Sequence, residues 1–303
     1  MFYTARMRPA YRIESCKTAL NRVSGMPFSW SLNPYMGCVH RCTFCYVRAF
    51  ELRADRPADS RYGASIRVKE NVGEVLAREL ARPSWRGESV AIGAATDPYQ
   101  PAEGRFRLTR ACLEVLAEAE NPFGLITRGP MVVRDTDVLA EASRRAEVSV
   151  TFSVPTLDED VWRQTEPGTA PPLQRLRALS KLVEAGVKAS VGMAPILPGL
   201  SDRPEQLAAV VRAAREAGAC GIWANVLYLR PGTREHFLSC LADSWPELLP
   251  EYEHLYESRA YLGNARVEPV REAVRKLARD AGIRDRRTVR PVPTRPVQLT
   301  LAV

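Results

Sequence analysis

Asn33-Pro34-Tyr35-Met36-Gly37-Cys38-Val39-His40-Arg41-Cys42-Thr43-Phe44-Cys45-Tyr46 is the stretch on which the interpretation of this chain depends. It places Cys38, Cys42 and Cys45 in a C-x-x-x-C-x-x-C array. Three thiolates this close in sequence can wrap one corner of a compact iron–sulfur cluster. A cluster with only three protein ligands leaves one iron open, so the array predicts a site that binds a further small molecule.

Zinc is the ordinary alternative to a cluster at such an array. Structural zinc sites usually close with a fourth Cys or His at a recognisable spacing, and no second pair of cysteines follows here. His40 lies between the cysteines and would strain the loop as a fourth ligand. Three unligated cysteines in a turn are the remaining alternative, but free cysteines are usually scattered and buried. The array therefore favours a cluster.

The array, with an aromatic residue just before its last cysteine, resembles the signature of the radical S-adenosylmethionine (radical SAM) superfamily. The resemblance implies a [4Fe–4S] cluster ligated by Cys38, Cys42 and Cys45, whose open iron chelates the amino and carboxylate groups of S-adenosylmethionine. It places Phe44 against the adenine. It also implies a reductant such as flavodoxin or ferredoxin as a partner.

The composition is that of a soluble globular protein, with 46% hydrophobic and 26% charged residues among 303. No uncharged apolar run reaches the length that spans a bilayer, and residues 1–8 lack the apolar core of a signal peptide. Seven cysteines in a chain without an export signal disfavour a disulfide framework. We therefore expect a cytoplasmic protein with no membrane partner, in a reducing compartment that suits an oxygen-sensitive cluster.

The net charge of +8 calls for an acidic partner or a solvated basic face. Much of this charge lies near the C-terminus, where only four carboxylates accompany ten cations. A solvated helix face with a basic tail explains the segment at least as well as a nucleic-acid footprint, because it carries no interleaved aromatic residues for base stacking. The cations are Arg266, Arg271, Arg275, Lys276, Arg279, Arg284, Arg286, Arg287, Arg290 and Arg295.

Strand and helix patterns alternate along most of the chain. Such alternation predicts parallel βαβ units with right-handed crossovers. Six strands are expected, and six parallel units match the partial (β/α)6 TIM-like barrel that the resemblance implies. The expected strands are 28–32, 89–93, 123–127, 148–153, 187–193 and 221–227, and the expected helices are 71–81, 108–119, 132–144, 173–185 and 204–217.

The pattern divides the chain into three parts. Residues 1–27 show no clear periodicity and are expected to form a lead-in that packs across the barrel. Residues 28–227 form the barrel. Residues 228–303 are expected to be a helical extension, with an amphipathic helix around 267–277, that closes the open side of the barrel and ends in a basic tail.

Polar residues follow several of the expected strands, at the edge where α/β barrels place their chemistry. Thr96 lies in a polar cluster after the second strand, which is either a cofactor edge or a plain Asp-Pro turn. Arg128 closes the third strand, where it can hold a carboxylate or remain a solvated loop cation. Ser153 closes the fourth strand, and Arg175 follows on the next helix, either near the cofactor or at the surface.

The strand ends also resemble the radical SAM subgroup related to spore photoproduct lyase. The likeness rests on Tyr46 and on runs 166–169 and 194–196, and it is closer to uncharacterised actinobacterial relatives through runs 82–85, 96–100 and 198–202. It implies that Arg128 contacts the S-adenosylmethionine carboxylate and Ser153 its polar end. We count Phe44, Tyr46, Thr96, Arg128, Ser153 and Arg175 as candidate cofactor-binding residues.

Two departures separate the chain from spore photoproduct lyases. Those enzymes carry a hydrogen-donating cysteine just after the second strand, where this chain has the cysteine-free run 93–97. Their tyrosine before the last cluster cysteine is replaced by Phe44, which has no hydroxyl group. Repair of a DNA photoproduct is therefore the alternative hypothesis rather than the leading one.

The leading hypothesis is a radical enzyme of lyase or isomerase type. It cleaves S-adenosylmethionine reductively and abstracts hydrogen from a small molecule or peptide with the 5'-deoxyadenosyl radical, the cofactor doing the hard chemistry. Tyr46 and Cys240 are the candidate catalytic residues. Cys240 can return a hydrogen atom, as in epimerisation, although burial beside Phe237 and Leu241 is the more ordinary role for such a cysteine. A structural or electron-transfer iron–sulfur protein is disfavoured, because the open iron would have no purpose there.

Overall fold

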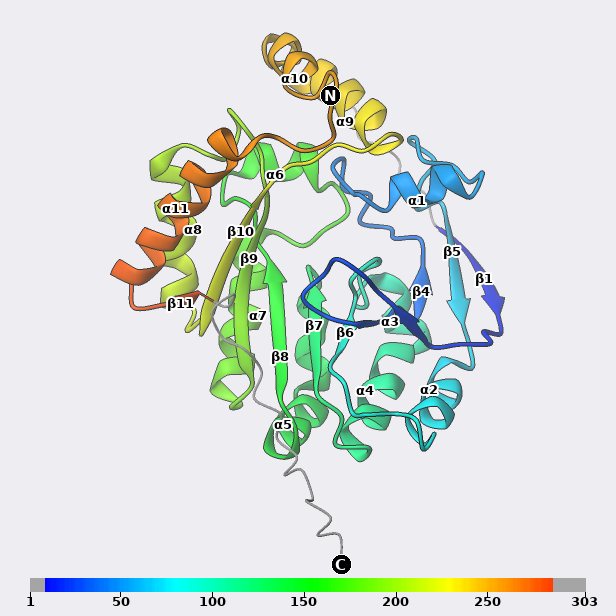
Figure 1. The fold of residues 1–303 in the computed structure, drawn as a ribbon. Coiled ribbons are helices and arrows are strands. Elements are labelled where there is room, and N and C mark those ends of the chain that lie inside the picture. The colour runs from blue at the N-terminus through cyan, green and yellow to red at the C-terminus, as the bar shows by residue number, and fades with distance from the viewer. Residues whose placement is uncertain (1–8, 286–303) are drawn as a thin grey trace, which may run out of the picture.

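A computed structural model describes residues 9–285 of the chain. Its main sheet has the strand order β11-β10-β9-β8-β7-β6-β3-β2, parallel throughout except where β2 pairs antiparallel with β3. Within the described residues β2 and β11 are unpaired edges, so the barrel stays open (Figure 1). The strands are β2 (Leu20–Arg22), β3 (Trp30–Leu32), β6 (Val90–Ile92), β7 (Phe123–Thr127), β8 (Val148–Ser153), β9 (Lys188–Ile196), β10 (Gly221–Val226) and β11 (Arg284–Asp285). This confirms the partial barrel and all six expected strands.

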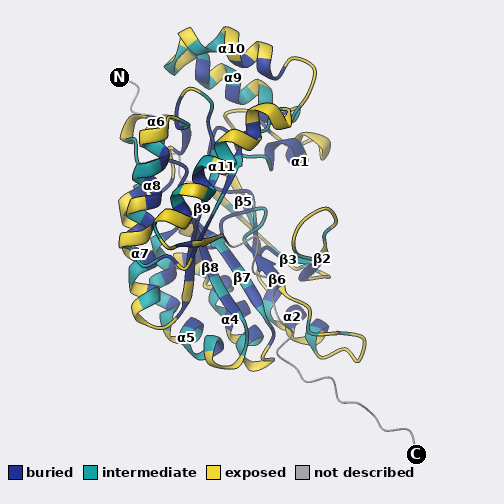
Figure 2. Ribbon diagram, turned by 60° about the vertical axis from the view of Figure 1, so that its left-hand side comes forward, coloured by how far each residue is buried: buried dark blue, intermediate teal, exposed yellow. Residues whose placement is uncertain are grey.

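The outer face of the sheet is covered by amphipathic helices, and Figure 2 shows their buried sides turned toward the strands. Alternate strand residues such as Ile92, Leu125, Phe152, Val191 and Ala224 belong to one core with the apolar sides of these helices. The helices are α2 (Val72–Leu80), α4 (Leu108–Glu118), α5 (Thr136–Arg145), α7 (Pro172–Glu184), α8 (Pro204–Glu216) and α11 (Asn264–Asp280). The helix expected over 132–144 instead starts as a 3-10 turn, η1 (Pro130–Asp135), opened by a proline.

The inner face of the sheet is largely polar. Successive strand residues point to opposite faces, so the residues between the core positions face the interior of the barrel. Thr151 of β8 and Ser190 of β9 meet there, with their hydroxyl oxygens 3.0 Å apart. The interior is therefore polar on this side of the barrel. The inward-facing residues of β8, β9 and β10 are Ser149, Thr151, Ser153, Ser190, Gly192, Trp223 and Asn225.

A second, three-stranded sheet lies beside the barrel, in the order β1-β5-β4. It joins β1 (Ala10–Glu14), β5 (Ser65–Lys69) and β4 (Tyr35–Met36). The sequence pattern does not predict it, and residues 1–27, which show no clear periodicity in the sequence, contain both β1 and β2. The reason is physical: β1 is a mostly exposed strand without the alternating burial that reveals a strand in a sequence.

The helices after β10 lie in two places. The elements α9 (Thr233–Ser244), η2 (Pro246–Leu248) and α10 (Leu249–Leu255) lie beyond the carboxyl ends of the strands, where they share a small core with Cys42 and Phe44 (Figure 1). The amphipathic helix α11 packs against β10 and α8 and leads into β11, a parallel strand that the sequence pattern does not predict. The remaining helices are α1 (Arg48–Arg53), α3 (Pro101–Phe106) and α6 (Glu159–Thr165). No helix within residues 9–285 is long and apolar enough to cross a bilayer.

Candidate active site

The cysteine loop follows β4, and contacts of Gly37 and Gln100 fix the backbone at its start. Gly37 has φ +82°, and a Cβ there would lie 2.7 Å from the Ser65 carbonyl oxygen, so only glycine fits. The buried amide of Gln100 donates from Nε2 to the Gly37 carbonyl at 3.0 Å and accepts from the Val39 N–H at 3.1 Å. The backbone leading into Cys38 is therefore fixed by the chain itself.

The loop after α6 supports the same cysteines from the other side. The Thr43 N–H donates to the Thr165 carbonyl at 2.9 Å, and the Gly168 N–H donates to the His40 carbonyl at 3.0 Å. A Cβ on Gly168 would come within 2.3 Å of the Val39 carbonyl oxygen, so the two backbones meet in contact. The run 166–169, which carries the resemblance, thus has a structural place directly against the cysteine loop.

The cysteine thiols lie in surroundings that suit a cluster. Cys38 and Cys42 are 7% and 6% exposed, and Cys45 is half-buried. Burial raises the pKa of the Cys42 and Cys45 thiols, while the cations of Arg128 and Arg48 respectively oppose that shift. Such thiols become stable thiolates when iron binds them, because a bound metal supplies the missing positive charge. The residues present therefore fit a [4Fe–4S] cluster.

A single metal ion would need a tighter group. Among the residues that the structure describes, no three His, Cys, Asp or Glu side chains gather closely enough to hold one ion. His40 lies with its Nδ1 3.3 Å from Asp97 Oδ2, out of line for a hydrogen bond. Burial by itself lowers the pKa of His40, but Cys38 and Asp97 raise it to about 10.

Arg128 lies beside the cysteine loop at the carboxyl end of β7. Its Nε donates to Glu166 Oε1 at 2.5 Å, its Nη2 donates to the Ala194 carbonyl at 3.2 Å, and its guanidinium carbon is 5.7 Å from the centre of the Phe44 ring. The side chain is 20% exposed, and within the described part of the chain its Nη1 makes no hydrogen bond. Arg128 thus has one guanidinium nitrogen, Nη1, whose N–H groups can serve a ligand at the mouth of the barrel.

Glu166 is fixed between two arginines. Its carboxylate accepts from Arg128 and, at 3.1 Å, from Nη1 of Arg175, and only 1% of its side chain is exposed. Although burial alone would raise the pKa of Glu166, the two guanidinium groups hold it below its usual value. This buried carboxylate fixes the direction of Arg128.

Arg175 is wholly buried, so the surface position that the sequence left open is wrong. Besides Glu166, its guanidinium donates to the Ser153 carbonyl at 2.8 Å, the Ala170 carbonyl at 2.8 Å and the Thr169 hydroxyl at 2.5 Å. All of its nitrogens have protein partners. Arg175 therefore connects α7 to the end of β8, where Ser153 is 5% exposed on the inward-facing side of the strand.

Thr96 and Asp97 occupy the strand end after β6. The Thr96 hydroxyl donates to the Tyr35 carbonyl at 2.6 Å, and this threonine is 2% exposed. Asp97 accepts from the Thr127 hydroxyl at 2.7 Å and from the Arg128 N–H at 2.6 Å. Asp97 thus joins the ends of β6 and β7 through its carboxylate. The sequence pattern indicated only that Asp97 belongs to a cofactor edge or an Asp-Pro turn.

The two candidate catalytic residues lie in different surroundings. The Tyr46 hydroxyl donates to the Ala94 carbonyl at the end of β6, and its ring lies 6.3 Å from that of Tyr228. Cys240 lies on α9, with its sulfur 3.6 Å from His236 Nε2. Burial and the Arg48 cation lower the pKa of His236 to about 4, so this imidazole is neutral at pH 7.

Arg48 is a site residue that the sequence pattern did not reveal. It is 1% exposed, donates to the carbonyls of Ala58 and Asp59 at 2.7 and 2.6 Å, and lies over the Tyr62 ring at 4.7 Å. The Tyr62 hydroxyl is 3.8 Å from the sulfur of Cys45. The only signal in the sequence is an arginine within an otherwise apolar run after the last cluster cysteine.

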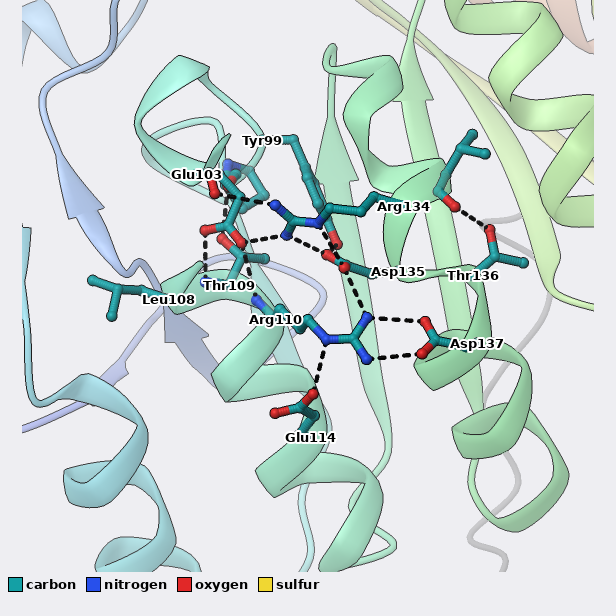
Figure 3. A network of polar contacts seen from close by, with 12 residues as sticks. Tyr99, Glu103, Leu108, Thr109, Arg110, Glu114, Arg134, Asp135, Thr136 and Asp137 are labelled. Atoms are coloured by element: carbon teal, nitrogen blue, oxygen red, sulfur yellow. Dashed lines mark hydrogen bonds and ion pairs between the residues drawn. The ribbon is translucent and has the colours of Figure 1, made fainter. Parts of the chain in front are cut away.

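A network of buried charges supports the strand ends from outside the barrel (Figure 3). Tyr35 donates to Glu103 at 2.6 Å and Tyr99 donates to Asp135 at 2.9 Å, and both carboxylates have no exposed side-chain surface. Arg134 donates to both carboxylates at 2.7 Å and so joins them. The network connects β4, which leads into the cysteine loop, with the segment after β6.

Comparison with known proteins gives a family and several relatives. A family model described as the radical SAM superfamily matches residues 32–214. An uncharacterized protein of Mycobacterium tuberculosis is 38% identical over 265 residues, which are 86% of this chain and 78% of that protein. An uncharacterized protein of Acidianus two-tailed virus is 30% identical over 220 residues, covering 70% of this chain and 71% of the viral protein. The mycobacterial match confirms the expected actinobacterial relatives.

Solved structures share the fold. A variant of spore photoproduct lyase aligns with a TM-score of 0.68 at 16% identity, covering 89% of this chain and 79% of that one. A second structure of that enzyme, with bound AdoMet and dinucleoside spore photoproduct, aligns with a TM-score of 0.65. Streptococcus suis SuiB bound to the precursor peptide SuiA aligns with a TM-score of 0.53 at 15% identity, covering 84% of this chain and 47% of that one.

Proposed function

The chain belongs to the radical SAM superfamily, and we propose that it abstracts a hydrogen atom from a small organic molecule or peptide. It is an enzyme whose cofactors are a [4Fe–4S] cluster and S-adenosylmethionine. When bound, the reduced cluster and S-adenosylmethionine would together supply the one-electron chemistry that removes a hydrogen atom from the substrate. The observation that carries the proposal is the buried cysteine loop at the carboxyl edge of an open parallel barrel with a polar interior.

Cys38, Cys42 and Cys45 would hold the cluster, and Arg128 would receive the carboxylate of S-adenosylmethionine. Support comes from the free Nη1 of Arg128 beside Cys42, on a guanidinium already fixed by Glu166 and Ala194. A charge-assisted hydrogen bond from a preorganised donor loses little entropy on binding. Phe44, under the same guanidinium, would lie against the adenine, and Ser153 would meet the polar end of the ligand.

Thr96 and Arg175 would act on the cofactor through other residues. Every nitrogen of Arg175 and the hydroxyl of Thr96 are already bonded to the protein. We assign Arg175 the positioning of Glu166 and Ser153, and Thr96 the positioning of Tyr35 below the cysteine loop. Their loss should weaken cofactor binding without removing a direct contact.

The fate of the substrate radical rests on groups that can return a hydrogen atom. Tyr46 and Cys240 are proposed for this step, which would make the reaction redox-neutral, as in an epimerisation. Tyr46 lies against the end of β6, whereas Cys240 lies on α9 beside His236 and near Arg48. Full turnover by a Cys240→Ala variant would remove Cys240 from this role, and full turnover by Tyr46→Phe would remove Tyr46.

Nucleic acid as a substrate has no specific support on the described surface. The cations of α11 are partly neutralised on the helix itself, since Arg275 pairs with Glu268 and Glu272, and Arg279 pairs with Glu272. The basic tail residues Arg286, Arg287, Arg290 and Arg295 lie outside the described residues. The shared fold with spore photoproduct lyase does not by itself assign a DNA substrate.

Anaerobic reconstitution tests the proposal. The full chain, loaded with iron and sulfide and reduced with dithionite, should convert S-adenosylmethionine to 5'-deoxyadenosine and methionine, quantified by mass spectrometry. A Cys42→Ala variant should show neither the cluster absorbance nor the product. Absence of 5'-deoxyadenosine from a wild-type chain that carries a full cluster and binds S-adenosylmethionine would refute the proposal.

A further inference from the structure

A cavity of about 180 Å³ opens where β10 ends and α11 begins. Its lining residues come from β10, the last long strand of the open sheet, from the segment before α11 and from α11 itself. Its lining combines apolar side chains with two amides and a guanidinium. The cavity is lined by Asn225, Val226, Leu227, Tyr261, Leu262, Asn264, Val267 and Arg271.

Arg271 is the charged group of the cavity, and its hydrogen bonding is incomplete. Its Nη2 donates to Asn225 Oδ1 at 2.6 Å. Its Nη1 forms a long ion pair with Glu268 Oε2 at 4.0 Å. Its Nε is buried and, within residues 9–285, has no hydrogen-bond partner. Buried polar groups in folded proteins are nearly always bonded to protein, water or ligand. Arg271 is therefore a cation with one hydrogen bond, one long ion pair and a buried nitrogen that lacks an acceptor.

The carboxylate nearest Arg271 is bonded more closely to another cation. Glu268 forms an ion pair and a hydrogen bond with Arg275, two turns further along α11. Arg275 also forms a hydrogen bond and an ion pair with Glu272, so these exposed charges of α11 neutralise one another. The positive charge of Arg271 is therefore only partly balanced by Glu268, and it can attract an anion into the cavity that it lines.

The remaining lining residues suit an apolar group. Val226, Leu227, Leu262 and Val267 supply aliphatic surface. Tyr261 adds a half-exposed ring, stacked on Tyr228 with centroids 4.9 Å apart. A ligand that fills the cavity would combine an anionic group with an apolar body.

The cavity lies close to the proposed cofactor site. The Nη2 of Arg128 bonds to Ala194 of β9, and two residues further Ile196 of β9 pairs with Val226 of β10, which lines the cavity. Adjacent strands are about 4.8 Å apart, so the cavity is one strand away from the contact that fixes Arg128. Asn225, which holds Arg271, is on the inward-facing side of β10.

We infer that this cavity binds the substrate through an anionic group, a carboxylate or phosphate carried on an apolar body, and that Arg271 recognises the anion. Identifying the bound molecule as the substrate rests on the proposed function, whereas the binding of an anion does not depend on it. The net charge of +8 favours the approach of such a molecule. Arg271 would be a specificity-determining residue, since an uncharged analogue would leave its guanidinium without an acceptor.

Calorimetric titration of the full, cluster-loaded chain tests the inference. The probes are hexanoate, hexyl phosphate and hexanamide, which share an apolar chain and differ in charge. At least one anion should bind about tenfold more tightly than the amide, as expected for a hydrogen-bonded charge. Hexanoate against hexyl phosphate then tells which anion the cavity prefers.

Two variants make the result specific. Arg271→Met should remove the preference for the anion, whereas Arg275→Met, at a similarly exposed position of the same helix, should keep it. Equal binding of anions and amide, no saturable binding of either anion, or an unchanged preference in Arg271→Met would overturn the inference. Formation of 5'-deoxyadenosine without substrate, measured on the same samples, tests the proposed function separately, because Arg271 does not touch the proposed cofactor site.

Discussion

Glu166 and Arg271 are two charged groups at the same edge of the barrel, and they differ in how completely other residues pair with them. Glu166 is almost fully buried and is bonded by two guanidinium groups. Arg271 has a single hydrogen bond and a buried nitrogen without a partner among the described residues. A saturated charge holds structure in place, whereas an unsaturated one is available to a ligand. The difference separates the part of the site that would position the cofactor from the part that would select the substrate.

Replacing Glu166 should have the largest effect on stability. A Glu166→Gln substitution leaves Arg128 and Arg175 without their shared counter-charge, and breaking a buried ion pair in this way costs about 3–5 kcal/mol. We expect a loss of this size in the free energy of unfolding in urea. Glu159→Gln on α6 is the control, because its pair with Arg163 is exposed and should be worth less than about 1 kcal/mol. Equal losses in both variants would contradict the role given to Glu166.

The effect of Glu166 should depend on pH. Its pKa is lower in the folded chain than in the unfolded chain, so the ionised carboxylate stabilises the fold at neutral pH. That contribution is present above the unfolded pKa, about 4.3, and is lost as the pH falls through the lower folded value. Urea unfolding at a series of pH values should show wild type and Glu166→Gln converging below about pH 4. A difference that stays constant to lower pH would contradict this.

Two aspartates of the network in Figure 3 should differ in their contribution to stability, by less than Glu166 and Glu159 do. Asp135 has no exposed side-chain surface and accepts from Tyr99, Arg110 and Arg134, whereas Asp137 is 64% exposed and pairs with Arg110 alone. Asp135→Asn should lower the free energy of unfolding by about 2–3 kcal/mol, because the hydrogen bonds it loses are to charged groups. Asp137→Asn should cost less than about 1 kcal/mol. Thermal unfolding of both variants tests this difference. A larger loss of stability in Asp137→Asn than in Asp135→Asn would contradict it.

Gly168 tests whether the loop after α6 positions the cysteines. Gly168→Ala places a Cβ 2.3 Å from the Val39 carbonyl oxygen, so one of the two loops has to move. Overpacking of this kind costs about 1–3 kcal/mol, and the iron content after reconstitution should fall with it. Gly73→Ala on α2 is the control, since its Cβ finds its nearest neighbour at 3.5 Å. Full iron loading in Gly168→Ala would show that the loop is not needed.

Most of the barrel could be predicted from the sequence because its helices bury one apolar face and strands such as β8 alternate apolar residues in the core with polar residues on the inner face. The apolar periodicity of segments such as α2 and β8 follows directly from that burial. The β1-β5-β4 sheet and β11 could not be predicted, because they are short or exposed and are stabilised by neighbours far away in the sequence. Local patterns carry no information about such pairings.

The site was predictable only where a motif carries chemistry. The three cysteines and Arg128 stand at recognisable places, a loop array and a strand end. Gln100 and Arg48 could not be found in this way, since their importance lies in contacts with backbone that the fold brings together. Arg271 was visible only as one cation in a basic segment, and its unpaired nitrogen becomes apparent only with Asn225 beside it.

Urea unfolding of Arg271→Met beside Glu166→Gln tests most directly whether saturated and unsaturated charges serve different purposes here. Arg271 contributes one hydrogen bond and leaves one buried nitrogen unpaired, so its removal should change the free energy of unfolding by less than about 1 kcal/mol. Glu166→Gln should cost several times as much. A loss in Arg271→Met as large as that in Glu166→Gln would mean that Arg271 is a structural residue, and would contradict the division of the site proposed above.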